Sequence, residues 1–205
     1  MILTDKDIRA LCTNEKKSTA GMINPFFEES LQSESYDLAI GKRIAVLKKE
    51  VRCIDITDQN KIDSIYDEME LPASGYVLSP KEYVLVSLNE NIALPESITA
   101  HIRPRTRFTR LGLLVSDQHC NSTYEGNLKL GLFNATDYAI KIFPGVRIAQ
   151  IVFEELKSTP SSEKMYKNKV NAVYQNEQEF RGAVASKKLE DKVAEAVSLL
   201  LKRDN

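Results

Sequence analysis

The sequence predicts a mainly β fold, a sandwich or barrel with a short helix at its start and an amphipathic helix at its end. From about residue 36 to residue 153, short runs rich in β-branched, aromatic and leucine residues are separated by Pro, Gly and Asn, as in strands joined by turns. The runs cover residues 83–88, 98–102, 128–133, 139–143 and 147–153. Because 205 residues with 42% hydrophobic content can bury one sizeable core and a small appendage, we expect one domain and a tail.

The two ends of the chain carry helical signals. Thr4 is a candidate N-cap, followed by acidic residues and by Ile8 and Leu11 at helical spacing. Residues 187–203 place leucine, valine and alanine at helical spacing between charges, which predicts a helix that packs either on its own domain or between subunits. The expected organisation is a domain over residues 1–186, including a polar arm at 154–186, and a helical extension at 187–205.

Charge and composition exclude several classes of function. A formal net charge of −1 disfavours broad binding to nucleic acid, which needs a large basic surface. No apolar run approaches the roughly 18 residues of a membrane span, and the N-terminus lacks a secretory apolar core. The three cysteines, Cys12, Cys53 and Cys120, form no closely spaced pair. We therefore expect a cytoplasmic protein with free thiols and no nucleic-acid or membrane partner.

An arginine cluster is the strongest local signal in the chain. Arg103, Arg105, Arg107 and Arg110 lie within eight positions that contain no acidic residue. In an extended segment the first three side chains would share one face, and guanidinium groups bind phosphate oxygens through two parallel hydrogen bonds. The alternative is a solvated sheet edge whose charges discourage strand pairing.

Several motifs occur in an order that resembles the dCTP deaminase family of the dUTPase-like superfamily. The resemblance covers nearly the whole chain up to Ser186 and is carried by Ile23–Pro25, Ser35–Gly41, Arg105–Leu113, Tyr124–Asn134, Pro144–Phe153 and Gly182–Ser186. It implies a distorted dUTPase-like β-barrel that forms a homotrimer, with a deoxyribonucleoside triphosphate bound between subunits. It also implies a magnesium ion held through the nucleotide phosphates, no zinc, and a C-terminal arm that closes over the ligand.

The resemblance also assigns residues to roles. Thr106 and Arg110 take the family's catalytic serine and arginine positions. The expected nucleotide-binding residues are Arg105, Arg107, Asn121, Tyr124, Gly131, Gln150, Tyr166 and Tyr174. No residue is assigned as a metal ligand.

Three positions depart from the family pattern. Gly131 stands where the deaminases have the glutamate that shuttles protons, and Asn121 stands where dUTP-hydrolysing relatives have the aspartate that activates water. An amide can hold water but cannot take its proton, and a general acid or base typically contributes about 10²- to 10⁴-fold. Val173 replaces a lysine of the arm. If the chain is an enzyme, we expect an atypical acid or base, with Glu125 the first candidate and Asp117 or His119 the others.

Gly131 has two interpretations. In a strand, glycine marks either a close approach by a ligand, here into a vacated pocket, or a β-bulge without functional meaning. Alternation along the strand would point Leu128, Leu130 and Leu132 to the core and Lys129, Gly131 and Phe133 to the other face.

A zinc site at His119 and Cys120 is disfavoured. Zinc deaminases carry His-x-Glu and a later Pro-Cys-x-x-Cys, and neither motif occurs here. Two adjacent ligands also fall short of the four that structural zinc takes.

Four hypotheses for function remain open. The first is a dCTP deaminase-like enzyme that converts dCTP to dUTP and ammonia. The others are a nucleotide-binding trimer without catalysis that senses or sequesters its ligand, a dUTP diphosphatase-like hydrolase, and a scaffold that uses the trimer and its added helix for docking. Thr106, Arg110, Gln150 and the arm argue against the scaffold, which has no need of phosphate-binding groups.

Overall fold

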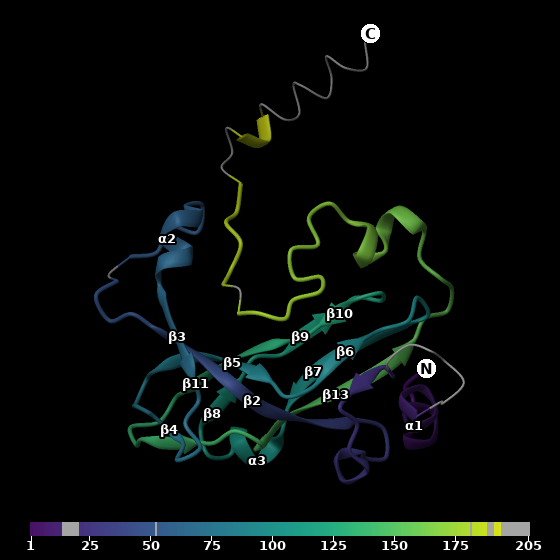
Figure 1. Cartoon of the computed structure of the whole chain (residues 1–205), viewed down its shortest axis with the longest axis horizontal. Helices are drawn as coiled ribbons and strands as arrows, with labels where there is room; N and C mark the ends of the chain where they lie inside the picture. The colour runs from purple at the N-terminus through teal and green to yellow at the C-terminus, as the bar shows by residue number, and fades with distance from the viewer. Residues whose placement is uncertain (14–20, 52, 181, 188–190, 194–205) are drawn as a thin grey trace. The chain divides into compact units, whose positions relative to one another are not determined.

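The computed structural model describes residues 1–13, 21–51, 53–180, 182–187 and 191–193. Helices are few and short: α1 (Asp5–Thr13), α2 (Gln59–Ser64), α3 (Thr106–Thr109) and the 3₁₀ turns η1 (Glu28–Ser30), η2 (Ser162–Lys164) and η3 (Tyr166–Asn168). The strands are β1 (Ile23–Asn24), β2 (Tyr36–Leu47), β3 (Tyr66–Glu70), β4 (Tyr76–Leu78), β5 (Tyr83–Leu88), β6 (Asn91–Ala93), β7 (Ile98–Pro104), β8 (Leu113–Val115), β9 (Gln118–Cys120), β10 (Glu125–Gly126), β11 (Lys129–Asn134), β12 (Ile140–Ile142) and β13 (Arg147–Glu155). The described chain is thus mainly β, which confirms the predicted fold class (Figure 1).

Contacts divide the chain into two compact units. The larger comprises Met1–Val46 and Glu68–Arg181, and the smaller comprises Leu47–Asp67 with the chain from Gly182 onward. Within the smaller unit, α2 begins at the N-cap Asp58, whose side chain accepts a hydrogen bond from the amide of Lys61. The end of the arm is bonded to the segment before this helix, since the amide of Ser186 donates to the carbonyl of Ile56 at 2.8 Å.

The larger unit is built around one curled antiparallel sheet. Its strand order is β8-β11-β5-β2-β13-β7-β9, with β3 also paired to β2. The twelve-residue strand β2 pairs with β5 on one side and β13 on the other, and the register shifts along both edges. Two small sheets, β1-β6-β10 and β12-β4, complete the unit. The five strand runs predicted from sequence are all present, within two residues at each end.

The opening helix is confirmed, but Thr4 is held differently from the expected N-cap, whose side chain would accept a helix amide. The backbone amide of Thr4 donates to the Asp7 carboxylate at 3.0 Å, and the Thr4 hydroxyl donates to the same carboxylate at 2.7 Å. The Asp7 side chain therefore supplies the acceptor at this helix N-terminus. Ile8 is fully buried and Leu11 packs against the core, so the apolar stripe faces inward.

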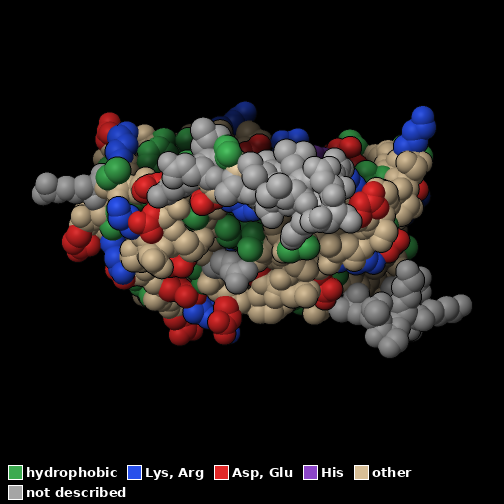
Figure 2. Space-filling model, turned by 90° about the horizontal axis from the view of Figure 1, so that it is seen from above, with side chains coloured by type: hydrophobic (Ala, Val, Ile, Leu, Met, Phe, Trp, Pro, Cys, Tyr) green, Lys and Arg blue, Asp and Glu red, His purple; other side chains and the backbone are tan. Residues whose placement is uncertain are grey.

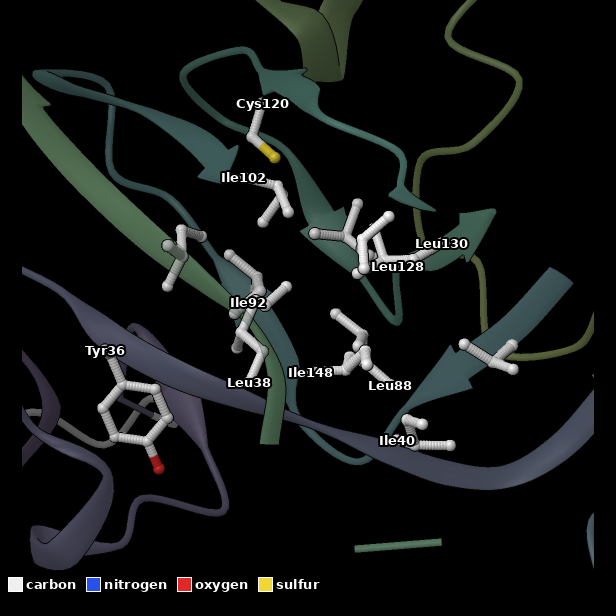
Figure 3. Close-up of a cluster of buried hydrophobic side chains, with 14 of the residues drawn as sticks. Tyr36, Leu38, Ile40, Leu88, Ile92, Ile102, Cys120, Leu128, Leu130 and Ile148 are labelled. Carbon is white, nitrogen blue, oxygen red and sulfur yellow. The ribbon is translucent and has the colours of Figure 1, made fainter. Parts of the chain in front are cut away.

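The core lies on the inner face of the curled sheet. Side chains from β2, β6, β7 and β11 converge there, among them Leu38, Ile92, Ile102 and Leu130 (Figure 3). Alternate residues of β2 and β11 supply this layer, as the period of a strand requires. The thiol of Cys120 closes one edge of the core, and burial raises its pKa to about 12.

The buried carboxyl group of Glu90 accepts a backbone hydrogen bond from β2. Asn89 and Glu90 form the turn between β5 and β6. The amide of Asn89 donates to the carbonyl of Ala39 at 2.8 Å, and the amide of Ala39 donates to Oε2 of Glu90 at 3.1 Å. The turn therefore substitutes for a strand partner where the β2 register shifts. Glu90 is only 1% exposed, and burial raises its pKa to about 7.

The predicted C-terminal helix can be compared with the structure only in small part. The amphipathic helix predicted at 187–203 lies largely outside the described residues, and the predicted boundary at 186 stays a prediction.

Among the helices of the described chain, none is long and apolar enough to cross a bilayer. In one view of the surface, acidic and basic side chains are interspersed over the described atoms (Figure 2).

Glu90 predicts a specific dependence of stability on pH. Because its pKa is raised from 4.5 to about 7, the folded state holds this proton more tightly, and the contribution of Glu90 to stability is full below about pH 4.5. This contribution should fall by about 3 kcal/mol as pH rises from 4.5 through 7, since one pKa unit is about 1.4 kcal/mol. Glu90→Gln keeps an acceptor for Ala39 without the charge. Urea unfolding from pH 4.5 to 8 should show this fall in the parent chain and a flatter profile in the variant; equal profiles would contradict it.

Candidate functional site

The arginine cluster does not lie on one extended strand, so the expected common face is wrong. β7 ends at Pro104, and the chain turns at once into the four-residue helix α3. Pro104 is still the register partner of Ala149, and the amide of Arg105 donates to the carbonyl of Ile148 at 3.5 Å before the helix begins. The guanidinium of Arg103 lies 3.7 Å from Asp117, and that of Arg107 lies 4.6 Å from the ring centroid of Phe108. The cluster therefore points in several directions.

The Arg105 side chain forms an ion pair with a buried carboxylate. Its Nη1 lies 2.9 Å from Oδ2 of Asp37, a carboxylate that is only 2% exposed on β2. Burial raises the pKa of Asp37, and the charge of Arg105 opposes that shift. Gln150 lies beside the pair, because it is the register partner of Asp37 on one side and of Arg103 on the other. The sequence alone did not indicate Asp37.

Thr106 and Arg110 remain exposed on the turn. The amide of Arg110 donates to the carbonyl of Thr106 at 3.0 Å, which closes α3. Within the described residues, the side chains of these two residues have no recorded hydrogen bond or ion pair. Arg107 is exposed as well, so a hydroxyl and two guanidinium groups lie at the surface on and beside α3.

Gly131 sits in a regular strand and is covered by a tyrosine. The register from Lys129 to Phe133 against β5 is unbroken, so the bulge interpretation is wrong. A Cβ atom on Gly131 would overlap the hydroxyl oxygen of Tyr83 and would lie 2.8 Å from Cε2 of that ring. The space expected to be vacant therefore holds the Tyr83 phenol. On the neighbouring strand end, Ser116 accepts the amide of Gly131 at 2.9 Å.

Lys129 adds a buried cation to the same face of β11. As predicted, Leu130 and Leu132 point to the core, so Lys129 shares the opposite face with Gly131. Its ammonium donates to the carbonyl and to the side-chain oxygen of Asn127, at 2.7 and 3.0 Å. Burial lowers the pKa of Lys129, while the nearby carboxylates of Glu177 and Glu68 oppose this.

The arm is hydrogen-bonded back onto the loop that precedes β11. The carbonyl of Glu125 accepts the amide of Asn176 at 2.7 Å, and the amide of Asn127 donates to the carbonyl of Glu177 at 2.7 Å. The side chain of Gln175 accepts from the amide of Glu125 at 3.3 Å and donates to the carbonyl of Thr123 at 3.1 Å.

A glycine permits this close approach. A Cβ atom on Gly126 would lie 3.0 Å from the amide nitrogen of Glu177 and 2.9 Å from the Tyr124 hydroxyl. The backbone angle φ of Gly126 is +152°, which side chains rarely allow. A substitution here would separate the arm from the loop.

Tyr124 packs against Tyr166, one of the two tyrosines of the arm. The rings of Tyr124 and Tyr166 have centroids 5.9 Å apart, and Tyr174 also packs against the core. Tyr124 is 4% exposed, and its hydroxyl oxygen has no hydrogen-bond partner within the described chain. Burial raises its pKa, and Glu177 adds to this shift. Asn121 is half-buried at the start of the loop, where its carbonyl accepts the amide of Tyr124.

A cavity of about 430 Å³ lies between this loop, β6 and the arm. Its volume is within the usual range for small-molecule pockets. The lining residues are Leu11, Met22, Ala93, Leu94, Pro95, Glu96, Thr123, Tyr124, Glu125, Lys167, Gln175 and Asn176. Glu96 is paired with Lys167 at 2.7 Å, whereas the exposed side chain of Glu125 has no recorded ion pair. No arginine of the cluster lines the cavity.

The remaining candidates lie on the outer side of β7 and β9. His119 is exposed and faces His101 across the strand pair, with ring centroids 4.9 Å apart. Cys120 points to the core instead. Over the described residues, no group of three His, Cys, Asp or Glu side chains is placed to hold a metal ion.

Sequence reasoning missed the residues whose role depends on long-range pairing. Tyr83, Ser116 and Gln175 contact the predicted residues Gly131 and Glu125 but lie 15 to 50 positions away in sequence. The only available signal was the glycine in a strand, which indicates that something approaches its backbone.

Comparisons with known proteins show the family of the chain. The family model for dCTP deaminase-like proteins matches residues 2–156. The dUMP-forming dCTP deaminase of Sulfurihydrogenibium sp. is 34% identical over 190 residues, which cover 91% of this chain and 97% of the relative. The corresponding protein of Hydrogenobaculum sp. is 36% identical over 162 residues, 78% of this chain and 86% of the relative.

A solved structure is also similar. The 2′-deoxycytidine 5′-triphosphate deaminase of Agrobacterium tumefaciens superposes with a TM-score of 0.59 and 27% identity over 75% of this chain, which spans about half (48%) of that protein. The family match spans most of the chain, and the two bacterial relatives exceed 30% identity. The chain is therefore a divergent member of the dCTP deaminase-like family.

Proposed function

We propose that this chain binds a pyrimidine deoxyribonucleoside triphosphate and processes it as a dCTP deaminase-like enzyme with an atypical acid or base. Family membership supports a dCTP deaminase-like function. The observation that carries the proposal is the hydrogen-bonded docking of Gln175, Asn176 and Glu177 on the loop 123–127, which leads directly into β11. A chain that no longer bound a ligand would have no need of this closing arm.

The exposed arginine turn supports a site shared between copies of the chain. Arg107, Arg110 and Thr106 offer phosphate-binding groups, yet none of them lines the cavity under the arm. Guanidinium groups bind phosphate oxygens well, and a second copy could bring this turn to the first copy's arm. We propose a homotrimer on these grounds, as the resemblance implies.

The proposed magnesium ion would be held mainly by the nucleotide. Mg²⁺ usually keeps several waters and binds substrate phosphates with few protein carboxylates. When bound, the ion would neutralise phosphate charge, while the chain's own residues orient the base. A cytoplasmic location, where nucleotides and free thiols are found, is part of the same proposal.

Glu125 is the proposed acid or base for deamination. The reaction adds water to C4 of cytosine and releases ammonia, so a proton must leave the water and reach the amine. Glu125 lies on the loop under the arm, and its carboxylate is not committed to an ion pair, in contrast to Glu96. Its backbone is fixed on both sides by Gln175 and Asn176.

A second candidate function is nucleotide binding without turnover. It is favoured by the Tyr83 phenol, which occupies the side-chain position of residue 131 and leaves no room for a carboxylate there. Such a protein would sense or sequester its ligand. Hydrolysis of dUTP is less well supported, because Asn121 offers an amide where a proton acceptor is needed.

The arm contact can be tested by nucleotide binding. Gln175→Ala removes both side-chain bonds to the loop, and two neutral hydrogen bonds are worth about 1–3 kcal/mol together, so affinity should fall by roughly 5- to 150-fold. Gln178→Ala is the matched control, since Gln178 is exposed. The measurement is the rise in melting temperature on adding dCTP or dUTP with Mg²⁺. If dCTP or dUTP raises the melting temperature of both variants equally, the arm does not contribute to nucleotide binding.

Turnover tests the role of Glu125. Purified protein with Mg²⁺ and dCTP should form dUTP or dUMP, resolved by ion-exchange chromatography. Glu125→Gln should lower the rate by about 10²- to 10⁴-fold, the usual contribution of a general acid or base, without preventing binding. Glu155→Gln, at the exposed end of β13, is the control. Product formation unchanged by Glu125→Gln would exclude this residue, and binding without product would favour the second candidate.

A further inference from the structure

We propose that Gln59 is a positioning residue that fastens the end of the arm and thereby strengthens nucleotide binding. Gln59 is the first residue of α2, in the smaller unit. Its side chain is hydrogen-bonded to Ala183 and Ala185, which lie 124 and 126 positions later in the chain. The inference rests on the proposed function, because it concerns how tightly the proposed site holds its nucleotide.

The side-chain amide of Gln59 binds the backbone of the arm on both sides of Val184. Its Nε2 donates to the carbonyl of Ala183 at 3.2 Å, and its Oε1 accepts the amide of Ala185 at 2.8 Å. A residue of a neighbouring parallel strand would bond the same two backbone groups. One side chain therefore satisfies a donor and an acceptor of a segment that forms no helix or strand of its own.

Further bonds hold the Gln59 side chain and the arm end in this arrangement. Nε2 of Gln59 also donates to Oδ1 of Asp63, one turn along α2, at 2.7 Å. The amide of Ser186 donates to the carbonyl of Ile56 at 2.8 Å, which adds a third bond to the arm. Ile62 of the same helix is buried, so α2 is packed and is not a loose surface turn. The arm end is thus bonded to a fixed element.

The arm is fastened at two places that are close in sequence. Residues 175–177 are bonded to the loop 123–127, and residues 183–186 are bonded to the segment 56–59. Because one structure contains both attachments, the contact with Gln59 does not compete with docking on the loop. Only five residues separate the attachments, and a short segment held at both ends has already lost much of its conformational freedom. A nucleotide that binds with the arm docked then has less ordering to offset.

Hydrogen exchange without nucleotide, followed by NMR, tests the attachment itself. In Gln59→Ala the amide of Ala185 loses its acceptor, so its protection from exchange should fall by roughly 3- to 10-fold, the size of one neutral hydrogen bond. Asn60→Ala, at the exposed next position of the same helix, is the matched control and should leave this protection unchanged. An unchanged melting temperature verifies that each variant is folded. Equal protection of Ala185 in the two variants overturns the inference.

Nucleotide binding tests the consequence. The parent chain and both variants are titrated calorimetrically, with Mg²⁺, with the α,β-imido analogues of dCTP and dUTP. Gln59→Ala should weaken the binding of the tighter analogue by roughly 3- to 10-fold, whereas Asn60→Ala should not change it. Coupling between two sites is reciprocal, so the same analogue should raise the protection of the Ala185 amide in the parent chain to a similar degree. A purely structural role of Gln59 predicts no such rise.

The outcomes separate this inference from the proposed function. Lost protection at Ala185 with unchanged nucleotide affinity overturns the inference and leaves the proposed function standing. Protection of Ala185 that does not respond to a bound analogue has the same meaning. Failure of the parent chain to bind either analogue overturns both.

Discussion

The buried ion pair between Asp37 and Arg105 is the constraint on which the arrangement of the larger unit depends. Asp37 lies on β2, the long strand that pairs with both β5 and β13, and it is almost completely shielded from water. A buried carboxylate without a partner is strongly destabilising, and Arg105 at 2.9 Å supplies the ion pair, with Gln32 donating a hydrogen bond at 3.4 Å. The pair ties the start of α3 to β2, the long strand of the sheet. Arg107 and Arg110, which follow Arg105, are exposed.

The same sheet determines what happens at residue 131. Continuous pairing of β11 with β5 brings the Tyr83 phenol over Gly131, and the two residues are mutually dependent. A larger residue at 131 would collide with the ring, and a smaller residue at 83 would leave a gap. The result is a dCTP deaminase-like framework in which the Tyr83 phenol occupies the side-chain position of residue 131.

Much of the fold could be predicted from sequence because its main strands are runs of β-branched, aromatic and leucine residues bounded by Pro, Gly and Asn. Residues 83–88 and 147–153 are such runs, and Ile8 with Leu11 at helical spacing marks the first helix. Strands β6, β9 and β10 have only two or three residues, too few to show a period. The helix α3 was also missed, since four residues after a proline carry no helical pattern.

The candidate site was predicted only where neighbours along the chain define it. The motif Tyr124–Gly126 and the arm tyrosines were identified, and they do meet in the structure. The partners Asp37, Tyr83 and Ser116 depend on which strands pair and in what register, which local sequence does not specify. The face shared by Arg103, Arg105 and Arg107 was wrong for a related reason, because Pro104 ends the strand between them.

A crystal structure of the chain with Mg²⁺ and the α,β-imido analogue of dUTP tests the central claim most directly. The account predicts the triphosphate against Arg110 of one copy and under the arm residues 175–177 of another, with the base beside the loop that carries Glu125. A nucleotide bound away from both the arginine turn and the arm would contradict it.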